Sequence, residues 1–153
     1  KAKEYLNLAK EQLKERKQQF DEQIRIGIMI EIPAIALIAD LAAEEVDFAS
    51  IGSNDLTQYL SAADRMNPEV AAYYKSDSTA MLRLLGFVFR EFSKREKEIS
   101  VCGEMAGNPE TAQLLVGLGA RKLSMSSGNI AGVKAKLAEC TLQELTALAE
   151  KKL

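Results

Sequence analysis

The sequence predicts an α/β protein in which parallel strands alternate with helices. Four short apolar runs are each followed by a segment with helical spacing, and polar residues gather at the end of each run. A helix between two strands carries the chain back to the same end of the sheet, so such strands pair in parallel. The polar residues then meet at one edge, where α/β proteins place their sites. Four such units make half of a (βα)8 barrel, or a small open sheet.

The chain opens with an amphipathic helix and a first strand–helix unit. Helical spacing over residues 1–20 is carried by Ala2, Leu6, Ala9 and Leu13. This segment has no N-cap and starts with Lys1 rather than Met, so we expect a fragment of a longer chain. The β-branched run Arg25–Glu31 predicts a strand, and Pro33 suits the first turn of the helix that follows. Helical spacing continues through Ala34, Leu37, Ile38 and Leu41.

The second unit contains the longest connection. The strand Val46–Gly52 is followed by a polar turn, Gly52–Asp55, and by a short helix over residues 56–63. An irregular stretch around Asn67 and Pro68 then leads to a long helix over residues 78–97.

Two more strands and three helices complete the prediction. Residues 99–103 and 123–126 read as strands, and residues 110–118, 130–138 and 142–153 read as helices. Asn108 and Pro109 suit the start of the first of these helices, and Thr141 with Glu144 forms a capping box for the last. The chain therefore divides into a leading helix (1–20), four βα units (24–140) and a C-terminal helix (141–153).

The amino-acid composition limits the classes of function that this chain can have. The chain has 153 residues, 47% of them hydrophobic, and its 20 basic residues nearly balance its 22 acidic ones. This balance disfavours a nucleic-acid or membrane-surface binder. No apolar run approaches the roughly 20 residues that span a bilayer, and the two cysteines indicate no disulfide framework, so we expect a cytoplasmic protein. The absence of histidine excludes histidine catalysis, histidine metal ligation and a phosphohistidine on this chain.

Two acidic residues follow neighbouring predicted strands. Glu31 ends the first strand and Asp55 follows the second, and neighbouring strands lie about 4.8 Å apart. Two carboxylates without histidine or thiolate suit Mg2+, which keeps several waters and completes its shell with substrate oxygens. A glutamate before Pro33 and an Asx turn at Asp55 would each also be ordinary.

Three further features allow two interpretations each. Cys102 ends a strand and is either a small buried residue or a thiol that exchanges a proton. Arg65 either pairs with Asp64 at the surface or clamps an anion. The stretch 125–129, MSSGN, either caps a helix, which its spacing favours, or cradles a phosphate.

Longer motifs resemble one family of enzymes. These motifs are GIMIEIP (27–33), DFASIGSNDLTQY (47–59), DR (64–65), VCGEMAG (101–107) and LGARKLSMS (118–126). They resemble the C-terminal phosphoenolpyruvate-binding barrel of the phosphoenolpyruvate-utilising enzymes. LTQYLSAADRMN and CGEMAG are most similar to the Enzyme I family, the phosphoenolpyruvate-protein phosphotransferases of bacterial sugar transport. The resemblance implies strands five to eight of a TIM-type (βα)8 barrel.

The resemblance also implies roles for single residues. Glu31 and Asp55 would be Mg2+ ligands, Asn54 and Arg65 would hold the phosphate of the substrate, and Cys102 would protonate the enolate carbon to give pyruvate. The implied acceptors are a histidine on a separate N-terminal domain and then the phosphocarrier protein. This chain has no histidine, and the arginines of the early barrel strands would precede Lys1, so we expect no turnover by the chain alone.

Two other functions remain open from the sequence. The chain could come from a pyruvate phosphate dikinase or phosphoenolpyruvate synthase of the same superfamily, or it could be a non-catalytic half-barrel scaffold. A half-barrel leaves two strand edges unpaired, here 25–31 and 123–126, so we expect a homodimer unless the first helix shields one edge.

Overall fold

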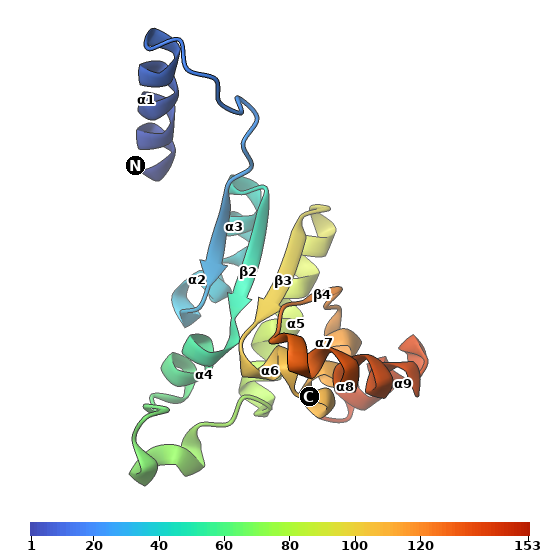
Figure 1. The fold of residues 1–153 in the computed structure, drawn as a ribbon. Coiled ribbons are helices and arrows are strands. Elements are labelled where there is room, and N and C mark those ends of the chain that lie inside the picture. Colours follow the sequence, from blue (N-terminus) through green and yellow to red (C-terminus); the bar gives the residue numbers. More distant parts are fainter.

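The computed structural model describes residues 1–153 and contains one four-stranded parallel sheet (Figure 1). In chain order the elements are α1 (Ala2–Glu15), β1 (Gly27–Ile30), α2 (Pro33–Leu37), α3 (Ala39–Glu45), β2 (Phe48–Gly52), α4 (Ser53–Ser61), the 3-10 helix η1 (Pro68–Tyr73), α5 (Thr79–Lys94), β3 (Glu98–Cys102), α6 (Glu104–Gly107), α7 (Pro109–Leu118), β4 (Lys122–Leu123), α8 (Ser127–Ala138) and α9 (Leu142–Glu150). The predicted α/β class and parallel sheet are confirmed. None of the helices combines the length and the hydrophobicity that a membrane-spanning helix needs.

The strands lie side by side in chain order, β1-β2-β3-β4. All pairs are parallel, so every carboxyl end lies at the same edge, where α2, α4 and α6 begin (Figure 1). Right-handed crossovers between successive neighbours place their helices on one face of a sheet, and α3 and α5 lie behind the sheet in this way. The two edges of the sheet are β1 and β4, as the sequence predicted.

The core lies between the sheet and these helices. Ile30, Ile51 and Val101 point from three neighbouring strands into it and are fully buried. Leu85 and Phe92 of α5 meet them from the helical side and are also fully buried. Fully burying one such side chain stabilises the fold by about 1.5–3 kcal/mol, so α5 contributes strongly to holding the sheet.

Alternate residues of the strands point away from the core, toward a face that no helix covers. Met29 is 44% exposed there. Arg25 lies over the ring of Phe48, 5.3 Å from its centre, and also 3.8 Å from Glu98 of β3. Lys122 of β4 reaches the same Glu98 at 2.6 Å, and this hydrogen bond lowers the pKa of Glu98. The open face is therefore crossed by a row of charges at the amino ends of the strands.

Most element boundaries differ from the sequence prediction by a few residues. The first helix ends at Glu15 rather than at residue 20, and β4 is reduced to two residues. Two of the predicted caps are confirmed: the Asn108 side chain accepts from the backbone of Glu110 and Thr111, and Thr141 with Glu144 forms the capping box.

The predicted helix after Pro33 is broken in two. Ile38, with φ −112° and ψ 32°, separates α2 from α3. Small residues rather than the large apolar ones then face the core: Ala36, Ala39 and Ala43 are fully buried, whereas Leu37 and Leu41 are 65% and 56% exposed. The alanines let α2 and α3 approach the neighbouring elements closely, and the larger side chains are left on the surface.

The leading helix α1 does not shield the β1 edge, which was the alternative left open by the sequence. No residue of α1 is buried, and Lys3 pairs with Glu45 of α3 at 2.8 Å. In Figure 1 α1 stands beyond the amino ends of β1 and β2, connected by an extended segment.

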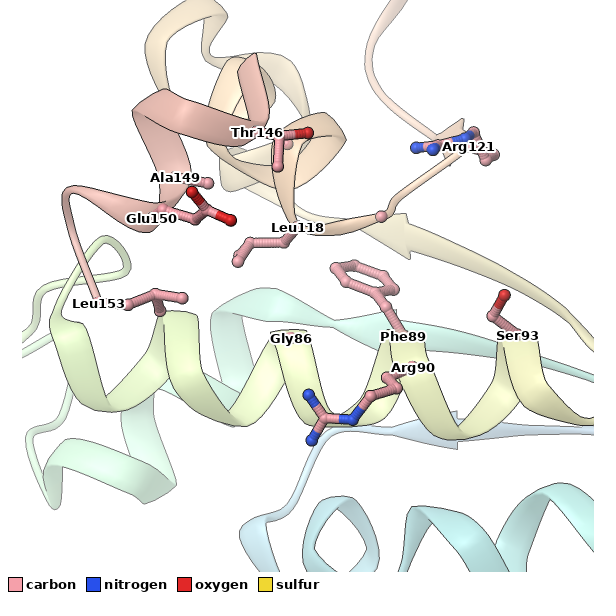
Figure 2. Close-up of a pocket in the computed structure, with 12 residues that line it drawn as sticks. Gly86, Phe89, Arg90, Ser93, Leu118, Arg121, Thr146, Ala149, Glu150 and Leu153 are labelled. Atoms are coloured by element: carbon pink, nitrogen blue, oxygen red, sulfur yellow. The ribbon is translucent and has the colours of Figure 1, made fainter. Parts of the chain in front are cut away.

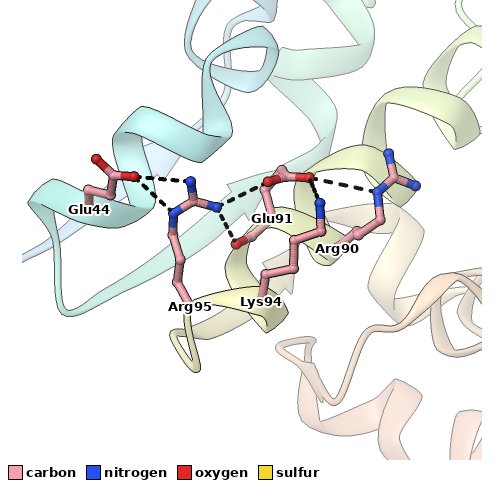
Figure 3. Close-up of polar contacts among 5 residues, drawn as sticks. All are labelled: Glu44, Arg90, Glu91, Lys94 and Arg95. Atoms are coloured by element: carbon pink, nitrogen blue, oxygen red, sulfur yellow. Dashed lines mark hydrogen bonds and ion pairs between the residues drawn. The ribbon is translucent and has the colours of Figure 1, made fainter.

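A charged network joins α5 to α3 on the outside of the helical layer (Figure 3). Glu91 is only 8% exposed, and its carboxylate forms ion pairs with Lys94 at 2.8 Å and with Arg95 at 3.0 Å. Arg95 also reaches Glu44 of α3 at 3.0 Å. The hydrogen bond from Lys94, followed by that from Arg95, lowers the pKa of Glu91 below its usual value of 4.5, against the opposing effect of burial.

This network predicts an acid-sensitive contribution to stability. A lowered pKa in the folded state means that the stabilisation is complete above pH 4.5 and is lost as the pH falls through the folded pKa. We expect Glu91→Gln to lower the free energy of unfolding at pH 7 and to flatten its decrease below pH 4.5, measured by urea unfolding at several pH values. Glu69→Gln, at an exposed glutamate of η1, is the control. Parallel pH curves for wild type and Glu91→Gln would contradict this prediction.

Candidate functional site

The predicted site residues come from the carboxyl edge of the sheet. Glu31 follows the last residue of β1, and Gly52 ends β2 opposite Cys102, the last residue of β3. A Cβ atom on Gly52 would stand 2.9 Å from Cβ and 3.0 Å from Oε2 of Glu31. Glu31, Gly52 and Cys102 therefore form a row across three strands, and the missing side chain at Gly52 leaves room for the Glu31 carboxylate.

The expected polar turn after Gly52 is instead the first turn of a helix. α4 begins at Ser53, so Asn54 and Asp55 lie at its amino end, both half-buried. The buried Ser53 hydroxyl donates to the carbonyl oxygen of Cys102 at 2.7 Å. This hydrogen bond ties the start of α4 to the end of β3, and so places Asn54 and Asp55 next to the Cys102 strand.

The side chain of Asn54 is oriented by the strand beside it. Its Oδ1 accepts a hydrogen bond from the backbone N–H of Glu104 at 3.0 Å. The approach is close because Gly103 has φ +99°, and a Cβ atom there would stand 2.8 Å from Asn54 Oδ1. With its oxygen committed to Glu104, the amide group of Asn54 keeps its Nδ2 donor for another partner.

Arg65 joins the site from the connection between α4 and α5. Its Nη1 lies 3.7 Å from Oδ1 of Asp55, and the two side chains are 40% and 43% exposed. The sequence suggested Asp64 as a surface partner, but Asp64 instead accepts from the backbone of Met66. Exposed ion pairs of this kind contribute about 0–1 kcal/mol, so Arg65 can exchange Asp55 for another anion at little cost.

Cys102 is half-buried, and its thiol donates to the carbonyl oxygen of Ile51 at 3.4 Å. Both Cys102 and Cys140 are free in the structure.

Tyr74 is a site neighbour that the sequence analysis missed. Its hydroxyl donates to the carbonyl oxygen of Asn54 at 3.1 Å. Burial, followed by the negative charge of Glu104, raises the pKa of Tyr74, while Arg65 acts in the opposite direction. Nothing in the irregular stretch around Asn67 and Pro68 distinguished this tyrosine from the adjacent Tyr73.

Two cavities differ in their relation to these residues. A cavity of 270 Å³ at the carboxyl edge is lined by Asn54, Gly103, Glu104, Gly107, Met125, Ser126 and Asn129. A larger one, of 420 Å³, lies between α5, α7 and α9, where Phe89 and Leu118 line it together with Glu150 (Figure 2). The smaller cavity contains Asn54 but not Glu31, Asp55, Arg65 or Cys102, and the larger cavity contains none of the predicted site residues.

The MSSGN stretch lies at this smaller cavity. Ser126 occupies the N-cap position of α8, but its side chain makes no capping hydrogen bond. The stretch therefore lies at the start of a helix, as its spacing predicted, but without a side-chain cap.

Comparison with known proteins decides the family. Residues 1–142 match a family described as the PEP-binding domain of PEP-utilising enzymes, where PEP is phosphoenolpyruvate. The chain belongs to this family. It is 45% identical over 142 residues to "Multiphosphoryl transfer protein 2" of Escherichia coli (strain K12), covering 93% of the chain and 17% of that protein. It is 42% identical over 150 residues to "Phosphoenolpyruvate-protein phosphotransferase" of Bacillus subtilis (strain 168), covering 98% of the chain and 26% of that protein.

The chain thus spans about a quarter or less of the relatives it matches. A third, "Multiphosphoryl transfer protein" of Xanthomonas campestris pv. campestris (strain ATCC 33913), is 47% identical over 131 residues, which are 86% of the chain and 16% of that protein.

The donor set of this PEP-binding domain limits how it could hold a metal ion. No group of three or more His, Cys, Asp or Glu side chains forms a metal cluster. A cation at Glu31 and Asp55 would take at most two carboxylates from this chain and complete its shell with oxygens of water or substrate. Oxygen-only ligation with an incomplete protein shell fits Mg2+ and does not fit a structural zinc site.

Proposed function

We propose that this chain is part of the PEP-binding catalytic domain of a Mg2+-dependent phosphoenolpyruvate-protein phosphotransferase. The family and the printed name of the Bacillus subtilis relative support this reaction rather than a dikinase or a scaffold. The observation that carries the proposal is the convergence of Glu31, Asn54, Asp55 and Cys102 at one edge of the sheet.

We propose further that the sheet is strands five to eight of a (βα)8 barrel. Strands in chain order with helices on one face are the arrangement of a barrel segment, since an open doubly wound sheet reverses its strand order to cover both faces. The uncovered face, with Met29 and the Arg25–Glu98–Lys122 row, would become the barrel interior when four more strands close it.

Two residues of this chain are suited to hold the phosphate of PEP. The Nδ2 group of Asn54 is free to donate to a phosphate oxygen, because Oδ1 is already committed to Glu104. Arg65 can turn from its weak pair with Asp55 to the phosphate, and a guanidinium can donate two parallel hydrogen bonds to it. Both interactions favour negative charge at the same place.

Glu31 and Asp55 would hold the Mg2+ ion. When bound, the ion supplies positive charge that neutralises the phosphate and enolate oxygens. Releasing Asp55 from Arg65 makes a carboxylate oxygen available, so one exchange of partners serves both the metal ligand and the phosphate ligand.

Cys102 is proposed as the acid. When the phosphoryl group leaves PEP, the bond between phosphorus and the enol oxygen breaks and the electron pair stays on enolpyruvate. The thiol of Cys102 gives its proton to the methylene carbon, a C–H bond forms, and pyruvate results. The thiolate then regains a proton from water.

The phosphoryl acceptor must lie outside this chain. The chain contains no histidine, so the proposed acceptor histidine belongs to another domain. That histidine would then pass the phosphoryl group to the phosphocarrier protein.

The metal proposal is tested on the chain itself. We expect Mn2+ to bind weakly, seen as enhanced water proton relaxation, and Asp55→Asn to abolish most of the enhancement because one of only two carboxylates is lost. Asp77→Asn, at an exposed aspartate before α5, is the matched control and should leave the enhancement unchanged. Equal enhancement in wild type and Asp55→Asn would refute the assignment of the ligands.

A further inference from the structure

The connection between α4 and α5, residues 62–77, is called the excursion here. It carries Arg65 to the site. From Asp64 to Tyr73 none of its residues is buried, and Met66 is 81% exposed. Packing of these residues therefore does not hold Arg65 in place.

The excursion is attached to the protein at its two ends. At its start Ala63 is buried and its N–H bonds the carbonyl oxygen of Gln58, whose side chain accepts from the N–H of Arg65 at 3.2 Å. Toward its end the hydroxyl of Tyr74 bonds the carbonyl oxygen of Asn54 at 3.1 Å. This second attachment returns the chain to the same turn of α4 that carries Asp55.

The two adjacent tyrosines differ sharply. Tyr73 is 70% exposed and makes no hydrogen bond through its hydroxyl, whereas Tyr74 is half-buried and reaches α4. Tyr73 also lines a cavity against α4, so the pair differs chiefly in the hydroxyl partner and provides its own comparison.

We propose that Tyr74 is a positioning residue, whose hydroxyl holds the excursion against α4 and so keeps Arg65 beside Asp55 before any substrate arrives. A segment fixed at both ends has fewer conformations to lose than one fixed at a single end. The side chain of Arg65 is then already oriented when an anion arrives. The benefit for PEP rests on the proposed function, but the hold on the excursion does not.

The hold is tested by trypsin, which cleaves after Arg65 and Lys75 faster when the excursion leaves the surface. Loss of one hydrogen bond raises the open population by about two- to tenfold. We expect Tyr74→Phe to increase the rate of cleavage after Arg65 by that factor, with an unchanged melting temperature, and Tyr73→Phe to cleave like wild type. Equal rates for wild type and Tyr74→Phe, or equally faster rates for both variants, would overturn the proposal.

The consequence for substrate is tested in the whole phosphotransferase. Tyr74→Phe should raise KM for PEP by about two- to tenfold with kcat little changed, and this effect should vanish in an Arg65→Ala background. Suppose that trypsin cleaves Tyr74→Phe faster than wild type, but that Arg65→Ala has the same KM for PEP as wild type. This result would refute the phosphate role of Arg65, while the attachment of the excursion by Tyr74 would stand. A Tyr74→Phe effect on KM that persists without Arg65 would overturn the positioning role.

Discussion

Replacing Cys102 by alanine in the whole phosphotransferase should slow pyruvate formation by about 10²–10⁴-fold, the usual contribution of a positioned acid. PEP binding should change far less, because a proton donor that acts in the transition state contributes to the rate rather than to ground-state affinity. The thiol sits at the carboxyl edge in the same row as Glu31, and alanine leaves the strand backbone and its hydrogen bond from Ser53 in place. Single-turnover kinetics with a separate measurement of Kd for PEP distinguish the two effects.

Cys140 provides the matched control for this substitution. It is also free and half-buried, but it lies after α8, where Gln113 approaches its sulfur at 3.3 Å. Cys140→Ala should leave pyruvate formation unchanged. Equal losses of rate and affinity in Cys102→Ala would show that the thiol acts in binding and not as the acid.

The isolated chain should self-associate, and this is the second large effect we expect. β1 is an unpaired edge, and a group of exposed apolar side chains lies in the segment that directly follows it in the chain. This group consists of Ile32, Leu37, Ile38 and Leu41. Two-fold symmetry would let two copies cover each other's edges, as most homo-oligomers close in this way. Light scattering after size exclusion at tens of micromolar should give about twice the 16.8 kDa of the chain.

Two substitutions distinguish association through the β1 edge from non-specific hydrophobic association. Leu41→Lys should shift the chain to a monomer, because it places a charge inside the apolar group that follows β1. Leu142→Lys, at a 51% exposed leucine of α9, should remain associated. A wild-type monomer that melts cooperatively and binds no hydrophobic dye would show that the edges need no cover.

Local signals in the sequence were sufficient for much of the fold. Asn108 with Pro109, and Thr141 with Glu144, act within one helical turn, and both form the predicted caps. The break at Ile38 was not predictable in this way. It depends on the close packing of Ala36 and Ala39, which only the neighbouring elements can impose.

The site shows the same division between local and distant causes. The strand pattern brought Glu31 and the Asn54–Asp55 pair to one edge because neighbouring strands are separated by a fixed distance. The orientation of Asn54 depends on the backbone of Glu104, fifty residues away, and the partner of Arg65 depends on how the excursion returns. Such contacts produce no periodic pattern in the sequence, so the contact of Tyr74 with the site could not be predicted from it.

Strand pairing in chain order also has a consequence for how this domain is made. Each strand joins the one synthesised just before it, so the sheet can grow by one strand at a time while the chain leaves the ribosome. No strand must wait for a partner from a later part of the segment. The last of these strands, β4, has only two residues, so the sheet edge that it forms is short and offers little surface for pairing with other chains.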